Sequence, residues 1–353
     1  MALAFTEPSD AALLWLRHVQ SDVERRLAEL LDLDDEQGID PRWSEALVRT
    51  REYALRPAKR LRPALVAIGH GMGSGHADVP DGLWRFAAAF ELLHTFLLIH
   101  DDVADAAERR RGSPALHRVL AEGKLGEDLA VVVGDHLFAR SIEVMLEPGL
   151  PGASHAVRYY LGICRQTAAG QYLDLDLTRA PLSEVTLFQT LRVAHLKTAR
   201  YGFVAPLVCG AMLAGAPRAL VDALDRVGRQ VGLAYQLRDD LIGLFGDSQV
   251  AGKSTDGDFV QGKRTFPVVA AYTRAPPATR SEMEALWAER PSDPVALARA
   301  RTLVTAHGGV AATERLIERA TRSARRALAA LPHGGGFRDL LDSLVVTLSR
   351  RRA

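Results

Sequence analysis

The stretch His100-Asp101-Asp102-Val103-Ala104-Asp105 decides the fold and the chemistry expected of this chain. It follows a long apolar run, 86–99, and precedes a basic run, 109–111. If the segment is helical, as its apolar lead-in indicates, Asp101 and Asp105 stand at i and i+4 and share one face, ~6 Å apart along the axis. Carboxylates after so apolar a segment are costly to bury without nearby positive charge. The arginines alone would meet that need in a solvated helix end, so this stretch by itself leaves a purely structural reading open.

A second aspartate pair, Asp239-Asp240, lies far downstream in Gln236-Leu237-Arg238-Asp239-Asp240-Leu241-Ile242-Gly243. It also follows an apolar run, and cations follow it at Lys253 and Lys263. Carboxylate oxygens are hard ligands for Mg²⁺, which commonly binds one or two carboxylates together with substrate phosphates. The cations would hold the remaining phosphate charge. Two such acidic walls that face each other predict a diphosphate clamped through bridging Mg²⁺ ions.

The composition narrows the class of protein. In 353 residues, 44 Lys and Arg balance 43 Asp and Glu, so the net charge of +1 indicates neither a nucleic-acid partner nor a membrane-surface partner. Cys164 and Cys209 lie in apolar contexts, which favours buried free thiols in a reducing cytosol. The first ten residues carry no secretory signal, and the longest uncharged run, 201–217, contains glycines and prolines typical of a buried helix. We expect a cytoplasmic protein with no membrane span.

Helical periodicity dominates the chain, and strand signals are nearly absent. The β-branched run 131–133 lies within a helical pattern, and no GxxxxGK[ST], HExxH, CxxC or GxSxG motif is present. The prediction is an all-α protein with one domain over 1–353. Helices are expected over 11–33, from Pro41, and over 64–72, 83–105, 128–146, 156–177, 191–213, 221–245 and three segments of 294–352. The loop 246–263 is long enough for a lid.

Several polar residues have both a structural and a functional interpretation. Lys59 and Arg62 belong to a stiff basic loop, 56–63, that is either a surface charge cluster or an anion site. His94 lies two turns before Asp101 on the same face, where a satisfied core histidine is the usual reading and a ligand contact is the functional one. Gln171 and Asp174 stand at i and i+3, so they either join the first acidic wall or cap their helix. Lys197 sits beside small residues, where a phosphate could approach the backbone closely.

Through these motifs the sequence resembles the trans-isoprenyl diphosphate synthases, or polyprenyl synthetases, which include geranylgeranyl and farnesyl diphosphate synthases. The resemblance runs from about Lys59 to Arg264. It rests on the set of motifs, namely Lys59-Arg60-Leu61-Arg62-Pro63, Glu91-Leu92-Leu93-His94 through Asp105, Arg110-Arg111-Gly112, Lys197-Thr198, Gln236, Asp239-Asp240, Lys253 and Lys263. It implies an isoprenoid-synthase-type bundle of helices around a deep central cavity, usually as a homodimer.

The implied reaction is head-to-tail condensation of an allylic diphosphate with isopentenyl diphosphate. The resemblance assigns about three Mg²⁺ to Asp101, Asp105 and Asp239, with further ligands, direct or through water, from Asp102, Asp174, Asp240 and Gln171. It places Arg110, Lys197 and Lys253 on the allylic diphosphate, with Lys263 among the substrate-binding cations. Isopentenyl diphosphate would bind Lys59, Arg62, His94 and Arg111. Thr198 and Gln236 would steady the cation and orient the diphosphate.

Three features depart from the family pattern. Pro57-Ala58 stands where the first basic motif usually has two glycines, which reduces the freedom of that loop. Gly243 stands where many members carry a third aspartate, so one metal ligand is missing or replaced by water. The loop before Lys263 is about one residue longer than in farnesyl synthases.

The expected product is geranylgeranyl diphosphate, with farnesyl diphosphate as the alternative. Phe96 and Leu97 occupy the fifth and fourth positions before Asp101, and one aromatic residue there without an insertion resembles the twenty-carbon pattern. Two other classes stay open, a class I terpene cyclase and a non-catalytic partner subunit. A cyclase needs no isopentenyl diphosphate site, and a partner subunit would be expected to lose aspartates from the first motif.

Overall fold

The computed structural model describes residues 8–32, 38–76, 79–147, 149–246, 257–290, 293–332 and 334–350. These residues are almost entirely helical, and their only strands are the two-residue β1 (Arg109–Arg110) and β2 (Ser113–Pro114), paired antiparallel. The prediction of an all-α fold is therefore confirmed. The chain divides into two compact units, which are described in turn; one domain over 1–353 stays a prediction.

The first unit contains residues 1–158, 206–217 and 333–340. Its elements are α1 (Pro8–Leu30), α3 (Pro41–Ala54), α4 (Leu61–Ser74), α5 (Asp81–Ala104), the β1–β2 hairpin, α6 (Leu116–Leu120), α7 (Gly123–Leu146), the start of α8 (Ala153–Leu177), most of α10 (Ala205–Leu213), η3 (Gly334–Gly336) and the start of α18 (Phe337–Ser349). The helices expected over 11–33, from Pro41, and over 64–72, 83–105 and 128–146 are all present.

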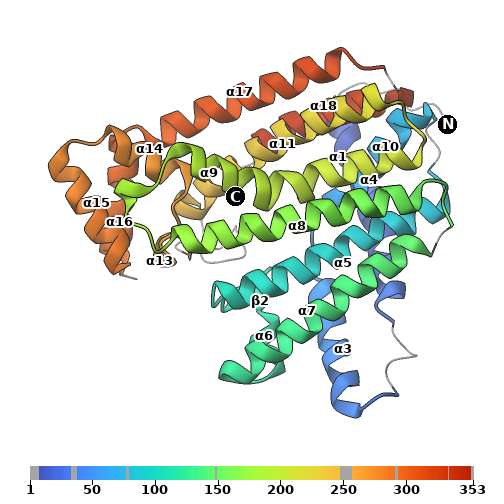
Figure 1. Ribbon diagram of the computed structural model, residues 1–353, viewed down its shortest axis with the longest axis horizontal. Helices are drawn as coiled ribbons and strands as arrows, with labels where there is room; N and C mark the ends of the chain where they lie inside the picture. Colours follow the sequence, from blue (N-terminus) through green and yellow to red (C-terminus); the bar gives the residue numbers. More distant parts are fainter. Residues whose placement is uncertain are drawn as a thin grey trace. The chain divides into compact units, whose positions relative to one another are not determined.

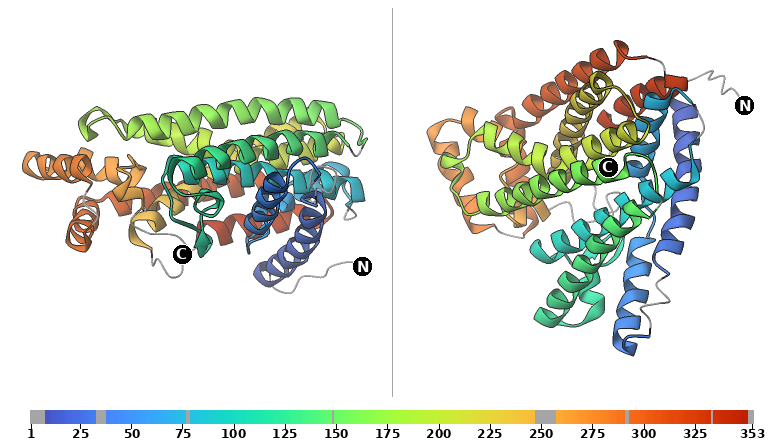
Figure 2. Two further views of the ribbon diagram at one scale, coloured as in Figure 1. Left: turned by 90° about the horizontal axis from the view of Figure 1, so that it is seen from below. Right: turned by 45° about the vertical axis from the view of Figure 1, so that its right-hand side comes forward.

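Helix α5 is the core of this unit and carries the first aspartate motif at its end. Its apolar residues from Leu83 to Leu93 are mostly buried, and it runs beside α7 (Figures 1 and 2). The close contact depends on Gly134 of α7, where a Cβ atom would lie 2.4 Å from the imidazole of His100. Within the described ranges, α5 is the one helix long and apolar enough to cross a membrane, but 61% of that window is buried inside the fold. A core helix of a soluble protein passes the same test.

The second unit contains residues 159–205, 218–332 and 341–353. Its elements are most of α8, η1 (Leu182–Glu184), α9 (Leu187–Val193), the π-helix η2 (Ala194–Val204), α11 (Arg218–Phe245), α13 (Gly257–Val260), α14 (Phe266–Arg274), α15 (Pro277–Glu289), α16 (Pro294–Ala306), α17 (Gly309–Ala329) and the end of α18. Helix α11 packs against η2 and α17, and Figure 1 shows α11 in yellow beside the red-orange α17. Apolar side chains of α11, α14 and α17 form one of its cores.

The segment 191–213 differs from the prediction, because the expected single helix is divided into α9, η2 and α10. The middle part is π-helical over eleven residues, Ala194–Val204. Pro206 lies two residues after its end, in the first turn of α10; it has no amide hydrogen to donate, and its ring crowds the preceding turn, which disturbs a regular α-helix. Wide π turns are frequent at functional sites, and this one carries Lys197 and Thr198.

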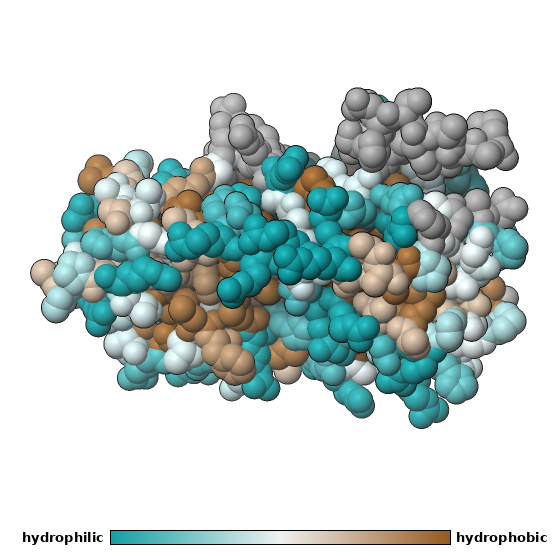
Figure 3. Space-filling model, turned by 90° about the horizontal axis from the view of Figure 1, so that it is seen from above, coloured by the Kyte–Doolittle hydropathy of each residue, from teal (hydrophilic) through white to brown (hydrophobic). Residues whose placement is uncertain are grey.

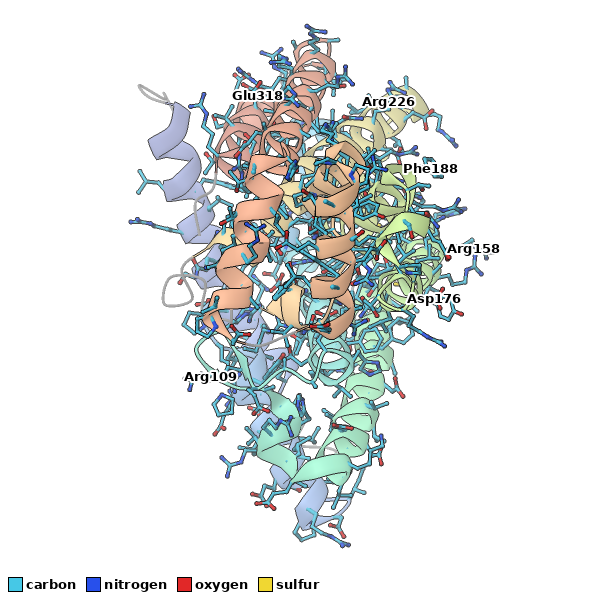
Figure 4. All side chains as sticks on the ribbon, turned by 90° about the vertical axis from the view of Figure 1, so that its left-hand side faces the viewer. Arg109, Arg158, Asp176, Phe188, Arg226 and Glu318 are labelled. Atoms are coloured by element: carbon cyan, nitrogen blue, oxygen red, sulfur yellow. The ribbon has the colours of Figure 1, made fainter. Side chains whose placement is uncertain are left out.

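The outer surface mixes polar and apolar side chains, and the face in Figure 3 shows apolar patches between polar stretches. Large exposed apolar side chains include Leu125, Leu129 and Val132 of α7 and Phe188 of α9. Phe188 projects outward from its helix in Figure 4. The first three stand at i, i+4 and i+7, so they form one stripe along α7.

Candidate active site

The first aspartate motif closes α5. The helix ends at Ala104, and the amide of the capping residue Asp105 donates to the carbonyl of Asp101 at 2.8 Å. Asp101 and Asp105 are therefore one turn apart, as the spacing predicts. The carbonyl end of a helix carries partial negative charge, so carboxylates placed there deepen a negative potential and favour a cation.

Asp102 is turned into the protein and is completely buried. Its Oδ2 accepts a hydrogen bond of 2.7 Å from the Tyr53 hydroxyl, and its Oδ1 accepts one of 2.7 Å from Nε of Arg110. Burial raises the pKa of Tyr53, and the negative charge of Asp102 raises it further. The phenol therefore keeps its proton and remains a donor. Asp102 thus fixes Arg110, whose guanidinium also lies 3.6 Å from Asp101.

The arginines of the β1–β2 hairpin point in different directions. Arg109 is exposed and projects away from the ribbon in Figure 4. Arg110 turns inward to Asp102, while Arg111 has a left-handed backbone, with φ of 53°, and donates to the carbonyl of Arg56 at 3.3 Å. This twist separates two successive arginines, so each can serve a different anion.

Two of the predicted isopentenyl diphosphate ligands, Arg62 and Arg111, lie close enough to His94 to act on its charge. Burial, and then the positive charges of Arg62 and Arg111, hold the pKa of His94 well below its usual value. Its imidazole is therefore neutral at physiological pH. Burial also lowers the pKa of Arg111 to about 10, which leaves this side chain charged at neutral pH. Lys59 is exposed on the loop before α4, whereas Arg62 is partly buried in the first turn of that helix.

The predicted chain-length residues lie on α5, and Phe96 forms a cluster of rings with α7. Its ring centroid is 4.5 Å from that of His100 and 5.3 Å from that of Phe138. Both contacts restrict the Phe96 rotamer, because rings held from two sides have little room to turn. Leu97 is partly buried on the next position of the helix.

In the second unit, the second aspartate motif lies near the end of α11. Asp240 is buried, and its Oδ1 accepts a hydrogen bond of 2.7 Å from the Gln236 amide. Gln236 in turn accepts one of 2.5 Å from the Thr198 hydroxyl of η2. Burial raises the pKa of Asp240 well above its usual value, and repulsion from Asp258 and its neighbours adds to this shift. A cation beside these carboxylates would relieve that repulsion.

Asp174 of α8 binds two of the predicted substrate cations. Its Oδ2 lies 2.7 Å from Nζ of Lys197 and 3.0 Å from Nζ of Lys263. Burial would raise the pKa of Asp174, but the two lysines outweigh it and lower the pKa. Asp176, two residues on, is exposed and points away from the helix in Figure 4. Asp174 therefore faces a polar cluster, and the capping alternative for it is not needed.

Asp258 of α13 explains how the second motif accommodates Gly243. A Cβ atom on Gly243 would lie 2.1 Å from Oδ2 of Asp258, so this carboxylate occupies the space that a side chain at 243 would take. Asp258 lies fifteen residues after Gly243 within the predicted loop 246–263, and the sequence alone did not single it out from the other aspartates of that loop. Nor did it single out Tyr53, which precedes its partner Asp102 by 49 residues.

The carboxylates fit a hard divalent cation that also takes phosphate ligands. Within the parts of the chain that the structure describes, no three histidine, cysteine or carboxylate side chains form a complete metal cage. Mg²⁺ seldom needs one, because substrate phosphates and water complete its octahedral shell. Burial is the main cause of the raised pKa of Asp240, and the added repulsion from Asp258, Asp239 and Asp174 shows that these carboxylates lie close enough for a cation to be favoured beside them. Lys253 and most of the predicted lid lie outside the described residues.

An all-α enzyme that holds diphosphates between carboxylates and cations is the class that this fold and these residues define. The family model "Polyprenyl synthetase" matches residues 44–304. The chain belongs to the polyprenyl synthetase family, so the predicted family and the prenyltransferase class are confirmed; members of this family generally depend on Mg²⁺.

Relatives and solved structures agree with this assignment. The chain is 37% identical over 290 residues to the geranylgeranyl diphosphate synthase of Mycobacterium tuberculosis, covering 80% of this chain and 77% of that one. It is 32% identical over 256 residues to a short chain isoprenyl diphosphate synthase of Methanothermobacter thermautotrophicus, covering 72% and 75%. The fold is similar to that of the geranylgeranyl pyrophosphate synthase of Corynebacterium glutamicum complexed with isoprenyl diphosphate and magnesium, with a TM-score of 0.86, 28% identity and coverage of 95% and 99%.

Proposed function

We propose that this enzyme condenses isopentenyl diphosphate with allylic diphosphates, head to tail, and releases geranylgeranyl diphosphate. The observation that carries the proposal is the division of charge in the first unit. Asp101 and Asp105 end α5 beside Arg110, whereas Arg62 and Arg111 surround a neutral His94. The first group suits a diphosphate that arrives with metal ions, and the second suits a diphosphate that is held by cations alone. A terpene cyclase requires only the first.

The allylic diphosphate is held by the carboxylates through Mg²⁺ and directly by cations. Asp101, Asp105 and Asp239 hold about three Mg²⁺ ions, as the family resemblance implies, with Asp102, Asp174, Asp240 and Gln171 contributing directly or through water. Bound Mg²⁺ neutralises the diphosphate and so makes it a better leaving group. Arg110, Lys197, Lys253 and Lys263 take up the charge that remains as the allylic C–O bond breaks. The proposal keeps the prediction of a single domain over 1–353.

Isopentenyl diphosphate binds to Lys59, Arg62, His94 and Arg111, which orients its double bond towards the allylic cation. A neutral imidazole at His94 donates or accepts a hydrogen bond without adding charge, so the arginines provide the electrostatic attraction. The hydrogen bond between Thr198 and Gln236 fixes two dipoles near the second motif, where they steady the cation. The released diphosphate takes the proton lost in the final step, so no protein base is required.

The twenty-carbon product rests on Phe96 and Leu97. The edge-to-face contact of Phe96 with His100 and its tilted contact with Phe138 support a rigid floor to the pocket on α5. A rigid ring stops chain growth better than a mobile one, because a growing prenyl chain displaces a side chain that is free to turn. Farnesyl diphosphate is the alternative product if the floor of the pocket lies closer to the aspartates than Phe96 does.

A product assay tests the function directly. Purified protein with Mg²⁺ and labelled isopentenyl diphosphate is offered dimethylallyl, geranyl and farnesyl diphosphates separately, with Asp101→Ala as the control. We expect twenty-carbon product from all three primers and none from the control. If no primer supports incorporation, the synthase is excluded and a cyclase or a non-catalytic partner subunit remains.

We also propose a homodimer in the cytoplasm. The exposed stripe Leu125, Leu129 and Val132 along α7 supports it, because apolar side chains in a continuous row are typical of a surface covered by a partner. Light scattering of the wild type and of Leu129→Glu tests this assignment. A dimer that the substitution converts to a monomer supports it, and a wild-type monomer contradicts it.

A further inference from the structure

Arg60 lies between the two predicted diphosphate-binding residues of the basic loop, yet it faces away from solvent. Only 2% of Arg60 is exposed, whereas Lys59 is exposed. Its backbone is left-handed, with φ of 45°. A non-glycine residue adopts this conformation only when its surroundings hold it there. The loop between α3 and α4 is therefore kept in an unfavourable backbone conformation by contacts of Arg60 itself.

The contacts of Arg60 join four helices of the first unit. Its Nη1 donates to Oε2 of Glu91 on α5 at 2.9 Å, and both side chains are within 1% of complete burial. Its Nη2 donates to the carbonyls of Ala54 at 2.9 Å and Arg56 at 3.2 Å, at the end of α3. Its Nε lies 3.7 Å from a carboxylate oxygen of Glu24 on α1. Arg60 itself directly precedes α4. Its guanidinium therefore fixes both ends of the loop, the one that follows α3 and the one that precedes α4.

Glu91 is unsuited to bind a diphosphate, because both carry negative charge. It lies one turn before His94 on α5, close enough that its charge offsets part of the lowering of the Arg111 pKa by burial. Its Oε1 accepts no hydrogen bond from the described residues, so Arg60 is its hydrogen-bond donor there. A buried carboxylate is costly unless a cation compensates it. Glu91 is therefore placed to hold Arg60, and through it the loop.

We propose that Arg60 and Glu91 are positioning residues for isopentenyl diphosphate, and that their ion pair holds the basic loop so that Lys59 and Arg62 present their charges to it. The inference rests on the proposed function of these two cations. Without the pair, Arg60 relaxes to an ordinary backbone conformation. That rotation changes the direction of the loop between Lys59 and Arg62, and their spacing no longer matches one diphosphate group.

The test separates positioning from stability. Removing one partner leaves a buried unpaired charge and risks unfolding, whereas replacing both by apolar residues of similar volume is often neutral or stabilising. The main variant is therefore Arg60→Met with Glu91→Leu. Arg26→Met with Asp81→Asn is the control for the loss of an arginine–carboxylate pair elsewhere in this unit, since this more exposed ion pair joins α1 to α5 and does not touch the loop. Glu91→Gln, which keeps the shape and one acceptor, is the conservative variant.

The readouts are the thermal midpoint, the KM for each substrate, and calorimetric binding of isopentenyl diphosphate alone. In the double variant we expect the KM and the Kd for isopentenyl diphosphate to rise about tenfold or more, with the KM for geranyl diphosphate within about twofold. Glu91→Gln is expected to lie between the double variant and the wild type, and the control to match the wild type. A folded double variant with a normal KM for isopentenyl diphosphate overturns the proposal.

If the double variant does not fold, Glu91→Gln decides, and a normal KM and Kd in that variant overturn the proposal. An equal rise in both KM values in the folded variants also overturns it, because that result indicates general disturbance. Failure of the proposed function is distinguishable, since then the wild type itself incorporates no isopentenyl diphosphate.

Discussion

Replacing Gly243 by alanine separates the stability of the second motif from its ability to use metal ions. The new Cβ atom would lie 2.1 Å from Oδ2 of Asp258, so the carboxylate has to retreat by about 1.3 Å to reach ordinary contact at 3.4 Å. The atom that moves is the end of a side chain and not backbone, so the movement is expected to change the free energy of unfolding little. Alanine in a helix is also favoured over glycine by about 0.5–1 kcal/mol. The variant is therefore expected to be as stable as the wild type or slightly more stable.

The metal dependence should change in the opposite direction. Asp258 lies close enough to raise the pKa of Asp240, so both carboxylates contribute to the same negative site. Displacing a carboxylate beside a metal site typically weakens metal binding about 10- to 100-fold. We expect the Mg²⁺ concentration for half-maximal activity of Gly243→Ala to rise about tenfold. Gly243→Asp, which restores the common family motif, is expected to bring no improvement, because Asp258 already occupies the space.

The assay is a Mg²⁺ titration of activity at saturating substrates, together with Mn²⁺ binding measured by electron paramagnetic resonance in the presence of inorganic diphosphate. Gly162→Ala on α8 is the matched control, since an added Cβ there meets nothing within 4 Å. A Gly243→Ala enzyme with unchanged Mg²⁺ dependence and unchanged Mn²⁺ binding would refute the reasoning. A large loss of thermal stability would refute the other part of the prediction, namely that the Asp258 carboxylate moves away at little cost in stability.

Three further predictions follow from the contacts of single side chains. Phe96→Ala should lengthen the products seen by chromatography, and Phe138→Ala should do so more weakly because it only releases the Phe96 ring; unchanged products in both would place the floor elsewhere. Tyr53→Phe removes a hydrogen bond to the charged Asp102 and should lower the free energy of unfolding by about 1.5–3 kcal/mol; a chemical denaturation curve unchanged from wild type would contradict this. The raised pKa of Asp240 means that the folded apo protein holds a proton that the unfolded chain releases as pH rises above about 4. Stability is therefore lost with rising pH up to the folded pKa, and Asp240→Asn should raise the melting temperature in EDTA at neutral pH but not near pH 3.

The sequence was sufficient for most of the long helices because their apolar periodicity is local, but it did not predict α13, α14 and α15. The run before Asp101 predicts α5, and the i, i+4 spacing of Asp101 and Asp105 is kept at its end. The π-helix over Ala194–Val204 was not predicted, and in the sequence only the nearby Pro206 marks the disturbance. Local pattern thus fixes that a helix forms but not how tightly it is wound.

The partners of the charged residues were less predictable than the residues themselves. The motifs name Asp102 and Asp174 as carboxylates of the metal walls, a role that stays a prediction. In the structure the first is bound by Tyr53 and Arg110 and the second by two lysines. Arg110 is only eight residues from Asp102 and was expected to offset its charge, whereas Tyr53, Lys197 and Lys263 lie far along the chain from their partners and nothing in their local sequence marks the pairing. Pairing of this kind depends on which helices pack together, and no spacing rule along one segment contains that information.

The prepaired charges also explain how such a site remains folded before its substrates bind. Asp174 and Lys197 satisfy each other in the absence of a diphosphate, as do Asp102 and Arg110, so the apo enzyme does not bury bare charges of one sign. A diphosphate that arrives with Mg²⁺ offers the lysine a new anion and the carboxylate a new cation at the same time. If these residues hold the substrate as proposed, each protein pair would be exchanged for two charge-assisted contacts. A diphosphate without metal would offer only the anion and would leave Asp174 with one lysine, Lys263, instead of two, so this arrangement would favour the metal-bound form of the allylic substrate.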